Sequence, residues 1–320
     1  MRVVQVGDVA GVGPALEAAL RGRTEIISVP FSQAGARRPE WLKAGYAPHR
    51  MVQAFRLARD VNRLRPDVVH IHWLPNALAG PLLAAPWIIH CHGSDVRDLS
   101  GWRRLMFPML LRRADAVVYS TPDLAPSVLP FRPDAVYLPT PIPEGLPVAP
   151  ATRDVLVGSR AAKVKGSEVA AEALRILLRG RPGLRVAAVD GPDFDHPAER
   201  LPFMPKSSFL AEIARSHVVL GQFALRALGI TELEAMSCGR PVVTAVDASL
   251  YPTPPPVQDA RTPEQIAVEA GRLLDDAEAA RHLGKLGRTW VREMCAPDDV
   301  ADRVIEVYRR VIEPEPKRRR

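Results

Sequence analysis

The sequence predicts an α/β protein built from two doubly wound domains that face each other across a cleft. Short runs of β-branched residues alternate with Ala-, Leu- and Arg-rich stretches of helical period. This alternation stops at residues 139–150, which contain five prolines, and then starts again. Near-continuous apolar strands separated by helices form parallel sheets that helices cover on both faces, and a Pro-rich stretch without periodicity is a linker.

The individual elements follow from the same pattern. Residues 52–65 predict a helix, because Leu57, Val61 and Leu64 form one apolar stripe. The predicted strands before the linker are residues 2–6, 25–29, 67–72, 87–92, 116–120 and 135–138. After it, the predicted strands are residues 155–158, 185–190, 218–222 and 242–245, and the predicted helices are residues 167–179, 208–216, 231–237, 263–275, 277–294 and 298–312.

Length and cysteine content fit a two-domain protein of a reducing compartment such as the cytoplasm. The chain has 320 residues, 47% of them hydrophobic, which is enough for two cores. Its three cysteines, Cys91, Cys238 and Cys295, are odd in number and far apart, which favours a reducing compartment over a disulfide framework. The first residues lack the apolar segment of a secretory signal, and no run approaches the roughly 18 apolar residues of a membrane span.

The charge is unevenly distributed along the chain. The formal net charge is +7, and residues 1–150 carry 17 Lys and Arg against 12 Asp and Glu. A basic face can meet an anionic membrane, a phosphorylated acceptor or nucleic acid, whereas the simpler interpretation is a solvated Arg surface. No aromatic residues interleave with the Arg residues and no nucleic-acid motif is recognised, so we expect no nucleic-acid partner.

The strongest motif is the run Gly-Ile-Thr-Glu-Leu-Glu-Ala-Met-Ser-Cys-Gly-Arg-Pro-Val-Val at residues 229–243. Thr231 fits a helix N-terminus, Gly239 its end, and Pro241 the entry to a strand. A helix that starts at Gly229 after a strand presents free N–H groups and a positive dipole end, which suit a phosphate. The alternative is an ordinary helix start.

This run resembles the donor-binding signature of the family 4 glycosyltransferases, which have the GT-B fold. In that signature two Glu residues are separated by seven others, and the second is followed by Ala-Met-Ala-Cys-Gly-x-Pro-Val. The resemblance implies that Glu234 holds the ribose of a nucleotide sugar and that Gly229, Ile230 and Thr231 bind the donor. Arg226 stands where the family has its first Glu, which contacts the donor sugar.

A second match lies at residues 158–166, where the family has a Gly-Arg turn followed by Lys-Gly. Fixed cations beside a helix N-terminus are what a departing diphosphate needs. The resemblance implies this role for Arg160 and Lys165, and Lys163 competes with Lys165 for it.

A third match is His92-Gly-Ser-Asp95, which resembles the family segment whose His reaches the donor sugar. The resemblance implies that His92 stabilises charge at the reacting centre, while Asp95 is better suited to a turn or helix cap. The glycine turn at residues 7–13 also matches the family, so Gly11 and Gly13 are expected to bind the donor. A Gly-x-Gly by itself is a weak signal.

Two His-x-His pairs, His70 with His72 and His90 with His92, raise the question of a metal. Residues i and i+2 of a strand share a face, so neighbouring strands can gather imidazoles into a zinc site. Because no carboxylate or Cys ligand is clearly placed, we expect packed or cleft-lining histidines and no metal site.

Residues 102–113 mix Arg with bulky apolar residues. They fit a packed helix with Arg snorkelling at both ends, in which Pro108 causes a kink unless it starts a new helix. The alternative is a membrane-surface helix, which would suit a lipid-linked acceptor and would place the protein at the inner face of a membrane.

Together the motifs imply a retaining, metal-independent glycosyltransferase without a cofactor, which moves a sugar from a nucleotide-diphosphate sugar to an unidentified acceptor. The resemblance implies a Rossmann-like acceptor-side domain at residues 1–145 and a Rossmann-like nucleotide-sugar domain at 151–296. It further implies that a helix at 297–316 crosses back to the first domain before a basic tail at 317–320. Two alternatives stay open: a nucleotide-sugar epimerase, and a non-catalytic protein of the same fold that binds a nucleotide sugar or a partner.

Overall fold

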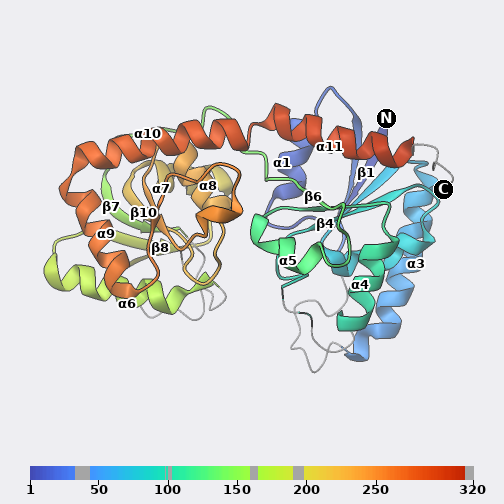
Figure 1. Cartoon of the computed structure of the whole chain (residues 1–320), viewed down its shortest axis with the longest axis horizontal. Helices are drawn as coiled ribbons and strands as arrows, with labels where there is room; N and C mark the ends of the chain where they lie inside the picture. The colour runs from blue at the N-terminus through green and yellow to red at the C-terminus, as the bar shows by residue number, and fades with distance from the viewer. Residues whose placement is uncertain (33–43, 98, 100–102, 159–164, 190–197, 314–320) are drawn as a thin grey trace. The chain divides into compact units, whose positions relative to one another are not determined.

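The computed structural model describes residues 1–32, 44–97, 99, 103–158, 165–189 and 198–313. The chain divides into two compact units. The first unit contains Met1–Pro141 and the residues from Pro297 onward, and the second contains Ile142–Ala296. Each unit has one sheet with helices on both of its faces (Figure 1).

The sheet of the first unit is parallel throughout and has six strands in the order β2-β1-β3-β4-β5-β6. The chain order reverses between β1 and β3, so this neighbouring pair is the topological switch point. The strands are β1 (Arg2–Val6), β2 (Glu25–Val29), β3 (Val68–His72), β4 (Trp87–Cys91), β5 (Ala116–Tyr119) and β6 (Val136–Tyr137).

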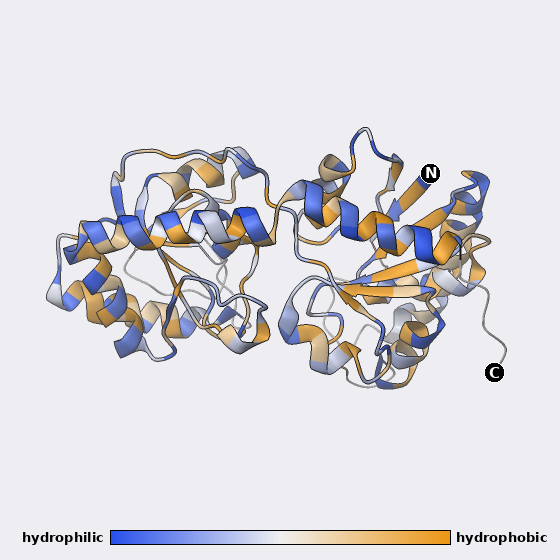
Figure 2. Cartoon of the chain, turned by 45° about the horizontal axis from the view of Figure 1, so that its top comes forward, coloured by the Kyte–Doolittle hydropathy of each residue, from blue (hydrophilic) through white to orange (hydrophobic). Residues whose placement is uncertain are grey.

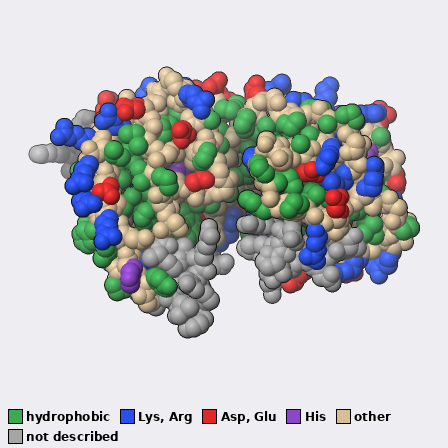
Figure 3. All heavy atoms as spheres, turned by 180° about the vertical axis from the view of Figure 1, so that it is seen from behind, with side chains coloured by type: hydrophobic (Ala, Val, Ile, Leu, Met, Phe, Trp, Pro, Cys, Tyr) green, Lys and Arg blue, Asp and Glu red, His purple; other side chains and the backbone are tan. Residues whose placement is uncertain are grey.

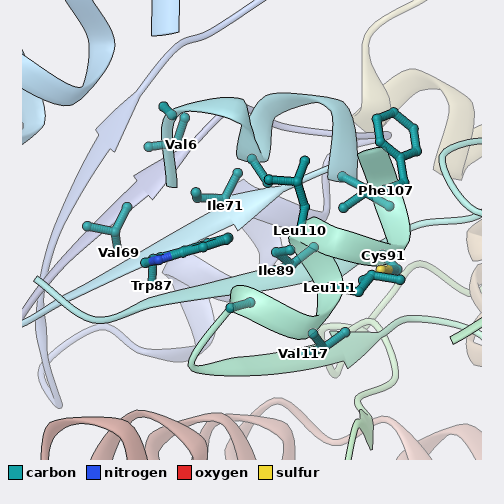
Figure 4. Close-up of a cluster of buried hydrophobic side chains, with 14 of the residues drawn as sticks. Val6, Val69, Ile71, Trp87, Ile89, Cys91, Phe107, Leu110, Leu111 and Val117 are labelled. Atoms are coloured by element: carbon teal, nitrogen blue, oxygen red, sulfur yellow. The ribbon is translucent and has the colours of Figure 1, made fainter. Parts of the chain in front are cut away.

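Helices bury both faces of this sheet, as the apolar runs of its strands require. One face packs against α3 (Ala47–Arg63), η2 (Leu74–Leu82), α4 (Arg103–Arg113) and α5 (Ala125–Val128). Figure 4 shows the centre of that core around Ile71, Ile89 and Phe107. The other face packs against α1 (Val12–Ala19) and α11 (Pro297–Ile312), and Tyr308 of α11 is fully buried there. Short 3-10 turns occupy Ala44–Tyr46 (η1) and Pro122–Leu124 (η3).

The second sheet is also parallel and has the order β12-β11-β10-β7-β8-β9. Counted from its first strand this is 3-2-1-4-5-6 read backwards, the strand order of dinucleotide-binding domains, with the switch point between β7 and β10. The strands are β7 (Arg153–Val157), β8 (Val186–Val189), β9 (Glu199–Leu201), β10 (Ser216–Leu220), β11 (Val242–Thr244) and β12 (Gln258–Asp259).

Two helix layers cover this sheet as well. On one face lie α6 (Ser167–Gly180) and α9 (Pro263–Asp275), and on the other lie α7 (Lys206–Ala214), α8 (Ile230–Ser237) and much of α10 (Ala277–Met294). The 3-10 turn η5 spans Ala248–Leu250. Figure 2 shows orange, hydrophobic strands in both units and helices with a blue side and an orange side. The predicted α/β class, with two doubly wound parallel sheets, is therefore confirmed.

Several local features differ from the sequence-based expectations or add to them. The strands β9 and β12 were not predicted, because each has only two or three residues and no apolar run. α4 continues through Pro108 without starting a new helix, and the carbonyl that loses its partner there belongs to the exposed Arg104. The Pro-rich segment contains neither helix nor strand, and its Ile142 and Leu146 pack into the core of the second unit.

None of the helices that the structure describes is both long enough and apolar enough to cross a membrane.

Candidate functional site

In the second unit, the loops that follow β7 and β10 meet at the switch point of the sheet. Gly158 follows β7 directly, and a Cβ there would lie 2.6 Å from Cγ2 of Thr231 in the first turn of α8. Only a glycine lets the end of β7 approach the helix this closely. Because ligands of doubly wound sheets bind outside the carboxyl ends of the strands at the switch point, the N-terminus of α8 lies where a phosphate is expected.

The start of α8 is held in place by a buried carboxylate. Oε1 of Glu232 accepts a hydrogen bond from the N–H of Gln222 at 2.7 Å, and Oε2 accepts one from the N–H of Gly229 at 2.9 Å. Glu232 is only 2% exposed, so both oxygens are used inside the protein. The N–H groups of Ile230 and Thr231 stand at the free end of the helix, where the helix itself offers no acceptor. Glu232 is thus a structural cap beside a ligand-accessible helix end.

Lys165 brings a cation to the same edge of the sheet. Its Nζ donates to Oε1 of Gln222 at 2.6 Å, and its carbonyl accepts from the N–H of Phe223 at 2.9 Å. The next residue, Gly166, begins α6 with a φ of 76°, and a Cβ there would lie 2.9 Å from the backbone nitrogen of Ala224. Lys165 is therefore fixed against the loop between β10 and α8. Arg160 and Lys163 lie outside the described residues.

Glu234 lies one turn further along α8 and is the site's second buried carboxylate. It is 4% exposed, and its Oε1 forms an ion pair with Nζ of Lys206, the first residue of α7. Its Oε2 is buried and has no hydrogen-bond partner among the described residues. Burial raises the pKa of Glu234, and the positive charge of Lys206 partly opposes this rise. A buried carboxylate oxygen without a donor is costly, which suggests that a ligand supplies one.

Arg226 lies in the loop between β10 and α8 and has an exposed side chain. Its carbonyl accepts a hydrogen bond from the N–H of Asp247 at 2.9 Å. Asp247 caps η5, and its pKa is lowered mainly by the hydroxyl of Ser249, with a smaller contribution from the charge of Arg226. Arg226 thus places a positive charge beside Asp247.

In the first unit, the loop after β1 turns on itself around Asp8. The Asp8 carboxylate accepts from the N–H of Gly11 at 3.2 Å and from the N–H of Gly13 at 2.9 Å. Gly11 caps α1 with a φ of 80°, and Ala10 also has a positive φ of 55°. The N-terminus of α1 is therefore occupied by the protein's own carboxylate, unlike that of α8.

The loops after β1, β3 and β4 meet at the switch point of the first sheet. A Cβ at Gly7 would lie 2.7 Å from Nδ2 of Asn76, whose side chain donates to the carbonyl of His72 at 2.8 Å. Trp73, directly after β3, has a φ of 74°. Backbone strain in a non-glycine residue persists only where the surroundings enforce it, and it is common at binding sites.

Asp95 ties two of these loops together. Its carboxylate accepts from the N–H of Leu74 at 3.0 Å, of Gly93 at 2.7 Å and of His92 at 3.1 Å. Burial raises the pKa of Asp95, and these backbone donors oppose the rise. Asp95 is thus a turn-forming residue that fixes His92, as the sequence predicts.

The four histidines of the two His-x-His pairs lie on the sheet face under α1 and α11, in two hydrogen-bonded pairs. Nδ1 of His72 is 3.1 Å from Nε2 of His92, and Nε2 of His70 is 3.2 Å from Nδ1 of His90. His72 and His70 each have a second partner. Nε2 of His72 lies 3.2 Å from Oε1 of Gln5, and Nδ1 of His70 lies 2.7 Å from the hydroxyl of Tyr308. The histidines are therefore packed against one another, as expected.

Burial dominates the electrostatics of this cluster. It lowers the pKa of His72 to about 4 and the pKa values of His70, His90 and His92 well below their ordinary value. Ligand nitrogens of His70, His72 and His90 lie within 4.8 Å of one another, a spacing that a metal ion can draw together. Two of the close contacts are hydrogen bonds between imidazoles, so the geometry is that of a neutral polar network.

Sequence reasoning missed three contributors to these sites. Glu232 carries a recognisable signal, because it stands three residues after the helix-capping Gly229. Gln222 was expected to end a strand, but β10 stops at Leu220 and Gln222 belongs to the loop. Lys206 lies 28 positions before Glu234, and no local pattern links the two residues.

One family model matches part of the first unit. Residues 3–136 match the family described as the glycosyl transferase 4-like domain. No curated protein matches the sequence closely enough to count as a relative.

Solved structures share the fold of the whole chain. The sucrose-phosphate synthase tll1590 from Thermosynechococcus elongatus has a TM-score of 0.73 at 17% identity, covering 98% of this chain and 100% of its own. Anabaena Alr3699/HepE, solved with UDP and glucose, has a TM-score of 0.73 at 13% identity, covering 96% and 99%. A UDP-forming α,α-trehalose-phosphate synthase from Burkholderia xenovorans has a TM-score of 0.72 at 12% identity, covering 97% and 99%. The chain thus has the GT-B fold.

Proposed function

We propose that this chain, whose residues 3–136 match the glycosyl transferase 4-like domain, transfers a sugar from a nucleotide-diphosphate sugar to an acceptor, with retention of anomeric configuration and without a metal or cofactor. The second unit binds the donor and the first unit supplies the acceptor side and His92. Structures of similar fold were solved with UDP and UDP-glucose, which makes a uridine diphosphate sugar the first donor to test.

One observation carries this proposal: the unpaired Oε2 of Glu234 beside the open N-terminus of α8, both within the described part of the chain. The helix end offers backbone N–H groups and a positive dipole end to the diphosphate. Thr231 and Glu234 are three positions apart on α8 and so lie on the same side of the helix. A diphosphate bound at Thr231 would therefore place its ribose near Glu234, whose free oxygen accepts from a ribose hydroxyl.

The chemistry that these residues supply is charge stabilisation. As the bond from the anomeric carbon to the diphosphate breaks, negative charge grows on the leaving phosphate oxygen. Lys165, fixed by Gln222, and the N–H groups of Ile230 and Thr231 stabilise that charge. Arg160 is proposed as a second cation for the same oxygen. In this proposal, retention arises because the acceptor attacks on the face that the diphosphate leaves.

A donor panel tests the proposal. The full chain is incubated with UDP-, GDP-, ADP- and TDP-sugars, each with polyol, oligosaccharide and lipid-linked acceptors, and diphosphate release and product anomer are recorded. We expect one donor to give diphosphate release and a product with the donor's anomeric configuration. Release with inverted configuration would contradict retention. Tight binding of a donor without release would favour a non-catalytic binding protein, and conversion of the donor alone would favour an epimerase.

We further propose a cytoplasmic protein that touches an anionic membrane through α3 and α4, where a lipid-linked acceptor would be met. The exposed residues of these helices mix large apolar side chains, such as Phe55 (57% exposed) and Leu105 (79% exposed), with arginines. Figure 3 shows Lys and Arg gathered along the margin of the first unit on which α3 lies in Figure 1. Apolar residues flanked by arginine favour the interface of an anionic bilayer.

A groove in this surface supports the same partner. It has a volume of about 700 Å³ and is lined by Phe55 and Leu82 together with Arg59, Arg63 and Arg65. α4 itself is anchored by the buried Phe107, Leu110 and Leu111, so its exposed Leu105 and Met109 are free to meet a bilayer.

Co-sedimentation with vesicles of anionic or zwitterionic lipid tests this contact. We expect binding to anionic vesicles that salt weakens and that F55S or L105S reduces at least about fivefold. Val268→Ser removes an equally exposed apolar residue from α9 of the second unit and should leave binding unchanged. Equal binding of all variants, or none to anionic vesicles at low salt, would contradict the membrane contact.

A further inference from the structure

We propose that Gln5 and His72 are positioning residues that fix His92 as the tautomer with a bare Nδ1, so that His92 presents a hydrogen-bond acceptor to a substrate hydroxyl. The role in sugar transfer rests on the proposed function, whereas the tautomer does not.

The chain of hydrogen bonds begins at Gln5 on β1. Its Oε1 lies 3.2 Å from Nε2 of His72, and because an amide oxygen only accepts, His72 must donate from Nε2. A neutral imidazole carries one N–H, so Nδ1 of His72 is left as an acceptor. That Nδ1 lies 3.1 Å from Nε2 of His92, which must therefore hold the proton of His92. Nδ1 of His92 then has no hydrogen and carries a lone pair that can accept a hydrogen bond.

The imidazoles of His72 and His92 are both neutral at physiological pH. Burial lowers the pKa of His72 to about 4 and the pKa of His92 well below its ordinary value. The charged group that acts on His72 is Asp8, whose effect is smaller than that of burial. Each ring therefore carries one proton, so His72 donates from one nitrogen and accepts at the other.

Nδ1 of His92, at the free end of this series of hydrogen bonds, is where a ligand is expected. Nδ1 of His92 is buried and has no hydrogen-bond partner among the described residues. His92 follows β4, and Asp95 fixes its backbone between the loops after β3 and β4. A buried acceptor without a donor costs about 1–3 kcal/mol, a penalty that binding of a donor relieves.

The direction of these hydrogen bonds also determines which ligand groups can bind at Nδ1 of His92. A hydroxyl brings a hydrogen to the Nδ1 lone pair, whereas a phosphate or carboxylate oxygen would set two lone pairs against each other. The other histidine pair runs from Tyr308 of α11 through His70 to His90. Nε2 of His90 also lacks a partner among the described residues, but His90 lies within β4 and is 1% exposed, whereas His92 follows the strand. The geometry thus points to a sugar or polyol hydroxyl at His92.

The test reads the tautomer directly. Long-range ¹H–¹⁵N spectra of the full, ¹⁵N-histidine-labelled chain at pH 7 report which nitrogen of His92 is protonated. We expect a protonated Nε2 and a bare Nδ1 in the wild type. Gln5→Met removes the acceptor for Nε2 of His72 and should give a mixture of tautomers. Gln53→Met, on α3 of the same unit, is the control and should change nothing.

Protonation of Nδ1 in wild-type His92 would overturn the proposal. This measurement uses the wild-type protein alone and so does not depend on whether a variant folds. An unchanged tautomer in a folded Gln5→Met variant would overturn the role of Gln5. With an active donor in hand, Q5M should lower kcat on the order of tenfold with little change in the KM for the donor. If no donor turns over, the proposed function fails while the spectra still decide the tautomer.

Discussion

Lys206 and Glu234 form an ion pair in which only one carboxylate oxygen is used. Nζ of Lys206 contacts Oε1 of Glu234, while Oε2 stays buried without a partner among the described residues. The lysine side chain is 55% exposed and the glutamate side chain 5%, so the two partners differ sharply in their contact with water. A buried carboxylate oxygen without a hydrogen-bond donor is costly, and the proposed donor site would supply that donor from a ligand hydroxyl.

Removal of this lysine should destabilise the second unit. In Lys206→Met the buried Glu234 loses its one charged partner among the described residues, and we expect unfolding at pH 7 to need about 1–2 kcal/mol less, since the exposed lysine is partly screened by water. The pKa of Glu234 is already raised by burial and should rise further. A carboxyl with a raised pKa costs stability at high pH and regains it as pH falls, so the loss should shrink at pH 5.

Urea denaturation at the two pH values measures this effect. Lys285→Met changes an exposed lysine of α10 and serves as the matched control. A loss that is the same at pH 5 and pH 7, or that Lys285→Met reproduces, would contradict a specific role for the Lys206–Glu234 pair.

Glu232 should matter for stability and much less for ligand chemistry. Its two oxygens accept from the N–H groups of Gln222 and Gly229, so Glu232→Ala leaves two buried donors without acceptors. We expect a loss of about 2–4 kcal/mol in the free energy of unfolding. Thermal and urea unfolding check this against Glu293→Ala, an exposed residue of α10. A stability equal to that of Glu293→Ala would mean that the cap is dispensable.

Lys165 should act on the departing diphosphate. Its Nζ is held by Oε1 of Gln222, so Lys165→Ala removes a preorganised cation and should lower the rate of diphosphate release about 10²–10³-fold. Gln222→Leu, which leaves the lysine but removes its anchor, should have a smaller effect. Single-turnover rates with the active donor measure both variants. A Lys165→Ala rate within twofold of the wild type would exclude this role.

The histidine cluster should make the first unit sensitive to acid. Burial lowers the pKa of His72 to about 4 and the pKa values of His70, His90 and His92 well below 6.5. Between pH 6.5 and about 4 the unfolded chain takes up protons that the folded chain does not, so stability is complete above pH 6.5 and falls as pH decreases. Each histidine contributes up to about 1.4 kcal/mol per pH unit.

Urea denaturation between pH 7.5 and 5 measures this dependence. We expect His90→Gln to reduce the slope of stability against pH, whereas His282→Gln, at an exposed position of α10, should leave the slope unchanged. Stability that rises between pH 7 and 5 would show that the cluster takes up protons in the folded state.

The fold was predictable because its strands are locally unambiguous. Runs such as Val3–Val4 and Ile88–Ile89 are β-branched and bury on both sheet faces, so a parallel sheet is their one stable environment. The short edge strands β9 and β12 were missed because they are polar and gain their order from the neighbouring strands β8 and β11. A local sequence pattern does not show which strands pair within a sheet.

The candidate site was predictable only where its residues lie close together in the sequence. Gly229, Thr231 and Glu234 stand on one helix start, and a sequence motif shows them together. The pairing of Lys206 with Glu234, and of Gln5 with His72 and His92, joins residues from separate elements. Such contacts depend on strand order and on burial, and a single sequence reveals neither.

Calorimetric titration of UDP and of UDP-glucose into wild-type and Glu234→Gln protein tests whether Glu234 belongs to a donor site. This substitution keeps the shape of the side chain but removes its charge, and Glu293→Gln is the exposed control on α10. We expect binding to the wild type and to Glu293→Gln, weakened about 10–100-fold in Glu234→Gln, since hydrogen bonds to a charged acceptor contribute about 1.5–3 kcal/mol. Equal affinity in all three proteins, or no binding of any nucleotide or nucleotide sugar to the wild type, would contradict a donor site at Glu234.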